Sequence, residues 1–108
     1  MAAIMGAMVT VEAARQLALA LPDVVERDHH GRPSFRVEGR IFATLWDPVH
    51  INVMLDEPGI HTAAEDNPRI CEVVWWGRRL AAVRVDLRRV EPDLLSELLE
   101  DAWECKLG

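Results

Sequence analysis

Cysteine is scarce in this sequence, which holds only Cys71 and Cys105 among its 108 residues. The two lie far apart, and neither has a second cysteine or a histidine two to four positions away. A small secreted domain stapled by disulfides would carry more cysteines than this. We therefore expect two reduced thiols at partly buried positions of a cytoplasmic protein.

Residues that form common catalytic motifs are equally few. The only serines are Ser34 and Ser96, and no serine or cysteine stands in a turn flanked by glycines, as a nucleophile elbow requires. No glycine-rich loop that could cradle a phosphate is present. Glu65 and Asp66 are adjacent, so on a helix their carboxylates diverge and indicate a solvated face. These absences predict that the protein is not an enzyme and holds no cofactor.

Metal-ligand spacings are also missing. His29 and His30 follow Asp28 and form a possible cluster of ligands, while His50 and His61 stand apart. Neither a His-x-x-x-His nor a Cys-x-x-Cys spacing occurs. We interpret the cluster as loop histidines exposed to solvent, and we predict no metal site.

No apolar run approaches the roughly 20 residues that a membrane-spanning helix needs. The apolar stretch Met1–Val11 lacks the basic region of a signal peptide, and Glu12 and Arg15 interrupt it. We therefore expect no membrane partner and a cytoplasmic location.

Length and composition indicate one domain. Half of the 108 residues are apolar and 28% are charged, which is the balance of a globular protein. We expect residues 1–8 to be a flexible extension and residues 9–108 to form a single domain. The true start codon stays open among three methionines: Met1, Met5 and Met8.

Positive charge is limited and unevenly placed. The net charge is −6, and Lys106 is the one lysine among twelve basic residues. Residues 32–89 hold nine arginines against eight acids, whereas residues 90–108 hold one lysine against six acids. The chain as a whole thus lacks the basic footprint that most nucleic-acid binders show.

Apolar periodicity and chain breakers predict the elements in the order α-β-β-β-α-β-α. Helices are expected over three stretches: 10–21, 58–66 and from Pro92 to near the end. Strands are expected over four stretches: 34–38, 41–46, 49–55 and 80–87. Residues 23–33 read as a polar loop, and residues 71–76 are left open between strand and loop. The 49–55 strand alternates, with His50, Asn52 and Met54 on its unburied face.

These elements predict an α+β fold. An antiparallel sheet with the helices packed on one face satisfies every apolar stripe, including the leucine stripe of the last helix. The acidic side of that helix would then face water, on the opposite side of the molecule from the bare sheet face.

Several motifs in a fixed order resemble a known family. The most specific block is Pro33–Val37 followed by Gly39–Ala43, with Trp76–Arg79 and Leu98–Trp103 further on. Over about residues 9–107 the sequence resembles the MmcQ/YjbR-like family. The resemblance implies a fold like that of CyaY and the frataxins, and DNA binding through a double-wing arrangement. The sequence departs from the usual pattern because Asn52–Asp56 holds no lysine, and because arginines replace lysines beside Trp76.

DNA is the first candidate partner. Six arginines lie in or beside the expected hairpins and are the candidate phosphate contacts: Arg32, Arg36, Arg40, Arg78, Arg79 and Arg84. The open alternative is a solvated sheet face with Arg–Glu pairs that contribute little.

A module that binds a protein or a small ligand is the rival. Its candidate surface is His30, Trp46, Trp75 and Trp76. In an extended segment, Trp75 and Trp76 cannot both point inward, and an exposed tryptophan often marks a contact surface. We expect His30, Trp46 and Trp75 to line a groove beside the sheet. The sequence leaves the oligomeric state open.

Overall fold

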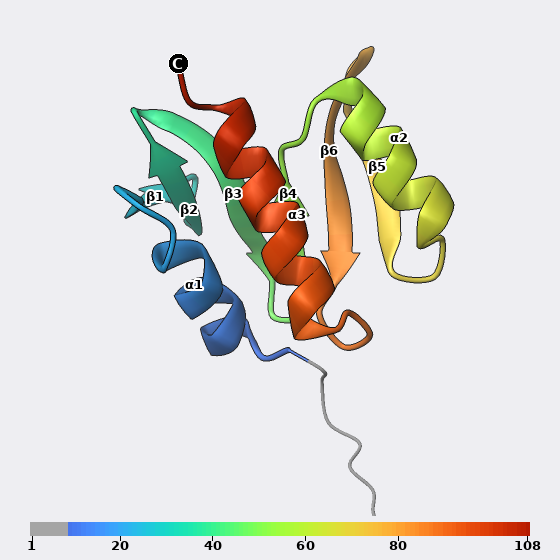
Figure 1. The fold of residues 1–108 in the computed structure, drawn as a ribbon, viewed down its shortest axis with the longest axis horizontal. Helices are drawn as coiled ribbons and strands as arrows, with labels where there is room; N and C mark the ends of the chain where they lie inside the picture. Colours follow the sequence, from blue (N-terminus) through green and yellow to red (C-terminus); the bar gives the residue numbers. More distant parts are fainter. Residues whose placement is uncertain (1–8) are drawn as a thin grey trace, which may run out of the picture.

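A computed structural model describes residues 9–108, which form an antiparallel sheet and three helices (Figure 1). The helices are α1 (Val11–Leu19), α2 (Glu57–Asp66) and α3 (Pro92–Cys105). The strands are β1 (Val25–His29), β2 (Arg32–Val37), β3 (Arg40–Asp47), β4 (His50–Val53), β5 (Cys71–Trp76) and β6 (Arg79–Asp86). They pair in the order β1-β2-β3-β4-β6-β5, and every neighbouring pair is antiparallel.

The three helices cover the same side of the sheet, with α3 across the centre, α1 beside it and α2 over β5 and β6 (Figure 1). This arrangement confirms the predicted α+β class with helices packed on one face. The expected flexible extension over residues 1–8 lies outside the described residues.

The element order contains two strands more than the sequence suggested. Residues 23–33 were expected as a polar loop, yet β1 forms there and pairs with β2 along its whole length. β1 is an edge strand with no buried residue, so it shows no apolar alternation for a pattern to detect. His30 (φ 54°) and Gly31 (φ 84°) close this hairpin with the two positive φ angles that a tight primed turn requires. The second additional strand is β5, which forms over the segment 71–76 that the sequence left open between strand and loop. It lies at the other edge of the sheet.

The helices begin where the sequence predicts. The Thr10 side chain accepts a hydrogen bond from the Ala13 N–H (3.0 Å) and caps α1. Asp56 accepts in the same way from the Gly59 N–H (2.9 Å) at the start of α2. The longest helix, α3, has 14 residues. Within residues 9–108, no helix combines the length and the apolar character needed to cross a membrane.

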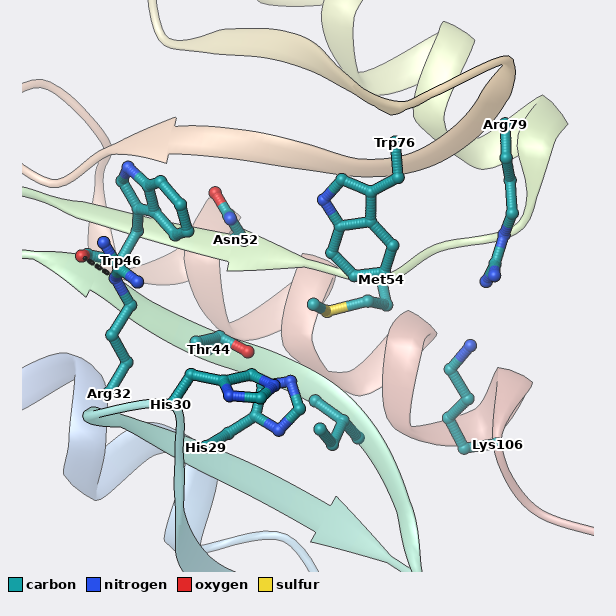
Figure 2. A pocket seen from close by; sticks show the side chains of 11 residues that line it. His29, His30, Arg32, Thr44, Trp46, Asn52, Met54, Trp76, Arg79 and Lys106 are labelled. Carbon is teal, nitrogen blue, oxygen red and sulfur yellow. Dashed lines mark hydrogen bonds between the residues drawn. The ribbon is translucent and has the colours of Figure 1, made fainter.

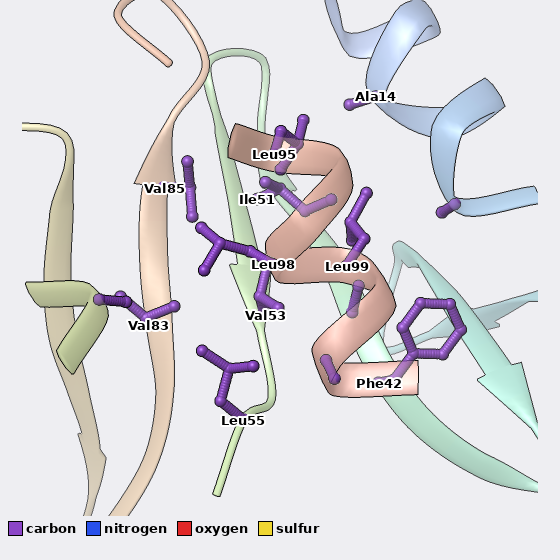
Figure 3. Packing of buried hydrophobic residues seen from close by; sticks show 14 of the residues in the cluster. Ala14, Phe42, Ile51, Val53, Leu55, Val83, Val85, Leu95, Leu98 and Leu99 are labelled. Atoms are coloured by element: carbon purple, nitrogen blue, oxygen red, sulfur yellow. The ribbon is translucent and has the colours of Figure 1, made fainter. Parts of the chain in front are cut away.

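The core lies between the helices and the sheet. Leu95 and Leu99 of α3 are fully buried, as is Ile51 of β4, and Figure 3 shows these side chains gathered under the helix. Each such side chain contributes roughly 1.5–3 kcal/mol when it leaves water. The apolar stripe predicted for the last helix is therefore what holds the helical layer on the sheet.

A bulge in β3 adds an aromatic ring to this core. Phe35 pairs with Ala43 and Arg36 pairs with Ile41, so Phe42 is an extra residue without a cross-strand partner in β2. The bulge breaks strict alternation, because Phe42 and its neighbour Ala43 are both fully buried. Ile41 is thereby left to point away from the helices.

Phe42→Ala should lower the free energy of unfolding by about 3–5 kcal/mol, because removal of this fully buried ring leaves a cavity. Val73→Ala, on the exposed edge strand β5, is the control and should cost less than about 1 kcal/mol. Urea denaturation followed by circular dichroism measures both values. Equal losses in the two variants would contradict the placement of Phe42.

The two cysteines should differ sharply in reactivity. Cys71 is buried, and burial raises the pKa of its thiol to about 11, so at pH 8 it stays almost entirely protonated. Cys105 is exposed near the end of α3. We expect the native protein to show one fast-reacting thiol with a disulfide reagent at pH 8, and Cys105→Ser to abolish that phase. A fast phase that survives in Cys105→Ser would show that Cys71 is accessible.

Candidate functional site

A groove of about 590 Å³ lies on the face of the sheet that the helices leave bare (Figure 2). Its lining comes from the β1–β2 hairpin, from strands β3 to β6 and from the end of α3. Among residues 9–108, no aspartate or glutamate lines it. Its volume falls within the range of small-molecule sites.

The floor of the groove is made by β3 and β4. Thr44 and Asn52 are cross-strand partners there, and Met54 lies beside them in Figure 2. The sequence placed Asn52 and Met54 on the unburied face of their strand. The structure puts them on the face away from the helices but buries them: Asn52 is 1% exposed and Met54 is 7% exposed. Side chains that project over the sheet cover most of this floor and leave only small openings onto the groove.

A second bulge of β3 places Trp46 in the groove. Leu45 pairs with Ile51 and Asp47 pairs with His50, so Trp46 has no cross-strand partner in β4. Its half-buried ring lies over the sheet and lines the groove (Figure 2).

Two arginines are held on the Trp46 ring. The Arg32 Cζ lies 3.8 Å and the Arg84 Cζ 4.4 Å from the ring centroid, both within cation–π distance. Arg32 Nε also donates to the Trp46 carbonyl oxygen (2.8 Å), and Arg84 Nε donates to Asn52 Oδ1 (2.9 Å). In the part of the chain that the structure describes, the Nη groups of both arginines have no hydrogen-bond partner. The two guanidinium groups are thus fixed in place, and their Nη groups are available to donate hydrogen bonds to a ligand.

Trp76 is the second aromatic wall. It pairs with Arg79 across the β5–β6 turn, and the Arg79 Cζ lies 5.8 Å from the Trp76 ring centroid. Trp76 stays 50% exposed. Lys106, just after α3, adds a third cation to the lining. Figure 2 shows Arg79 and Lys106 at one end of the groove and Arg32 at the other.

Two of the six predicted arginines, Arg32 and Arg79, line this groove, and a third, Arg84, contacts Trp46 and Asn52 of its lining. Arg36 lies on the same sheet face, because its Nε donates to Ser34 Oγ (3.3 Å) and Ser34 pairs with Thr44 of the floor. The remaining two, Arg40 and Arg78, lie at hairpin ends and do not line it.

Salt bridges of the described residues involve other arginines. The carboxylates within 4.0 Å of an arginine are partners of Arg15, Arg88 and Arg89. The Arg88 side chain, which donates to Asp86, holds the pKa of that carboxyl below its ordinary value. Within residues 9–108, none of the six predicted arginines forms such a pair, although Glu72 is the cross-strand neighbour of Arg84.

The tryptophan pair divides between the two faces of β5. Trp75 is 54% exposed and does not line the groove, whereas Trp76 does. The expected groove of His30, Trp46 and Trp75 therefore forms with Trp76 in the place of Trp75. Alternation predicts that the two rings diverge, but which one faces the groove depends on the register of β5 with β6, which shifts next to Trp75.

Sequence reasoning missed several lining residues, among them Thr44, Lys106 and His29. Lys106 carries a signal, because it is the one cation in an acidic tail. His30 was expected at the groove, whereas His29 was expected only as a solvent-exposed loop histidine; both line the groove, with their ring centroids 4.4 Å apart. Within the described residues, no group of three or more potential ligands is placed to hold a metal ion.

The fold and the groove define a small α+β protein whose bare sheet face holds an aromatic groove that, among residues 9–108, no carboxylate lines. A family model described as YjbR matches residues 19–105, and the chain belongs to the YjbR family. The match confirms the resemblance that the Pro33–Val37 and Gly39–Ala43 motifs indicated.

One solved structure supports the architecture. The crystal structure of the Deinococcus radiodurans protein DR2400, with a DUF419 domain, matches with a TM-score of 0.73 and 22% identity. The match covers 93% of this chain and 80% of that chain. At this identity the likeness shows the fold alone. No curated protein matches the sequence.

Proposed function

We propose that this protein binds nucleic acid through the bare face of its sheet and catalyses no reaction. The observation that carries the proposal is a groove that, among residues 9–108, is lined by three basic side chains, two tryptophan rings and no carboxylate, on a chain of net charge −6. Arginine and lysine contact phosphates, and aromatic rings stack on bases. The local composition is therefore that of a polyanion site, although the overall charge is not.

A cluster of negative charge lies on the other side of the molecule. A cleft between α2 and α3, in the helical layer, is lined by five acidic residues and by no arginine or lysine: Asp56, Asp66, Glu97, Asp101 and Glu104. Because the sheet separates this cleft from the groove, the acids do not face a ligand bound on the bare side. This separation of charge allows a polyanion to approach one face of an acidic protein.

Positive charge comes from both edges of the sheet. Arg32 lies at the start of β2, in the hairpin at one edge, and Arg79 lies at the start of β6, in the hairpin at the other. A strand of nucleic acid laid across the face would meet cations on both sides. The family resemblance implies DNA binding through a double-wing arrangement, and these two hairpins would be its wings.

Arg79→Glu should weaken binding of a DNA oligonucleotide and reduce the slope of log affinity against log salt by about one unit, because one phosphate contact is lost. Arg89→Glu changes the net charge equally, lies in the turn between β6 and α3 and does not line the groove, so it is the matched control. Fluorescence anisotropy in a salt series measures both. Equal effects of the two variants would show that binding depends only on the overall charge of the protein. Absence of binding by the wild type would refute the proposal.

A protein or small ligand is the second candidate partner, and one observation favours it. β5 is an edge strand whose Val73 and Trp75 side chains are 36% and 54% exposed. Exposed apolar groups on an unpaired edge are typical of a contact surface. Such binding would depend little on salt and would be lost in Trp75→Ala.

A further inference from the structure

We infer that the groove holds one unpaired nucleobase of a single strand, stacked on Trp76, with the flanking phosphates on the cations at the two ends. The inference rests on the proposed function and names the form of nucleic acid that the site accepts. Three features of the groove carry it: the free aromatic face, the polar floor and the position of the charges.

Trp76 is the aromatic platform. The Trp46 ring is already in contact with two guanidinium groups, at 3.8 and 4.4 Å from its centroid. The Trp76 ring is half exposed, and its nearest guanidinium carbon is 5.8 Å from the centroid. A planar base can therefore reach Trp76, whereas Trp46 serves to hold Arg32 and Arg84 in position. Stacking of this kind tolerates any base, because every base has a π face.

Two polar groups at the floor are available to the edge of a base. Asn52 and Thr44 are 1% and 5% exposed, and both line the groove. Asn52 Oδ1 is occupied by Arg84, but among residues 9–108 neither Asn52 Nδ2 nor Thr44 Oγ1 has a hydrogen-bond partner. Neither atom is sealed off from solvent, since the described residues include no fully buried side-chain polar atom without a partner. A buried donor that opens onto a cavity is a feature of sites that orient a polar ligand.

The charges lie at both ends of the groove. Figure 2 shows Arg32 at one end, and Arg79 with Lys106 at the other. A mononucleotide has phosphate on one side only, whereas a nucleotide within a strand has phosphate on both sides. The groove therefore matches a base inside a strand. A duplex keeps its bases stacked and paired, so it would have to expel one before Trp76 and the floor could be reached.

The experiment compares four probes by fluorescence anisotropy or competition: a 15-nucleotide single strand, its duplex, an abasic strand of the same length and a mononucleotide. We expect the single strand to bind at least roughly tenfold more tightly than the other three. Trp76→Ala should weaken single-strand binding by roughly tenfold, and Trp76→Phe should restore most of the loss.

Trp75→Ala is the matched control, because Trp75 is the adjacent residue, is equally exposed and does not line the groove. It should change single-strand affinity by less than about twofold. Thr44→Val, which removes the hydroxyl and keeps the shape, should weaken the single strand and leave the abasic strand unchanged. Circular dichroism checks that each variant is folded.

The outcomes separate this inference from the proposed function. If the duplex or the abasic strand binds as tightly as the single strand and Trp76→Ala has no effect, nucleic-acid binding stands and the base pocket is refuted. A mononucleotide that binds as tightly as the strand would show a free-nucleotide site and overturn the inference. If no probe binds, the inference and the proposed function both fail.

Discussion

β3 supplies side chains both to the core and to the groove, and its register with its two neighbours determines which side chain goes where. Two bulges interrupt its alternation, one at Phe42 opposite β2 and one at Trp46 opposite β4. The first turns a ring into the core, and the second places an indole over the bare face. A strand with unbroken alternation would not direct Phe42 and Ala43 to the same side.

The position of Trp46 in turn fixes the charges. Arg32 and Arg84 come from strands that are not neighbours, yet both contact this one ring and each donates its Nε to an internal acceptor. Aromatic and amide contacts hold them, and within residues 9–108 neither guanidinium group forms a salt bridge. Positive charge on this face is therefore a consequence of packing, and the acidic composition of the chain does not remove it.

Much of the fold follows from local signals, and the exceptions have physical causes. Caps at Thr10 and Asp56 mark the helix starts, and tight turns separate the central strands. β1 escaped detection because an edge strand without buried side chains leaves no pattern. The exchange of Trp75 for Trp76 in the groove follows from a register shift, and the contribution of Lys106 follows from where α3 ends in space. A likeness to CyaY, a cytoplasmic location and a single domain over residues 9–108 stay predictions.

The central claim, that the bare face is locally cationic on an acidic protein, is tested most directly by collisional quenching of Trp76 fluorescence. Iodide and caesium quenching are measured at equal ionic strength in the wild type and in Trp76→Phe, and the difference between them isolates Trp76. Local cations concentrate anions around the ring, so the account predicts that the ratio of the iodide to the caesium quenching constant is higher for this component than for uncharged N-acetyltryptophanamide. A ratio below that of N-acetyltryptophanamide, as the net charge of −6 alone would produce, would contradict it.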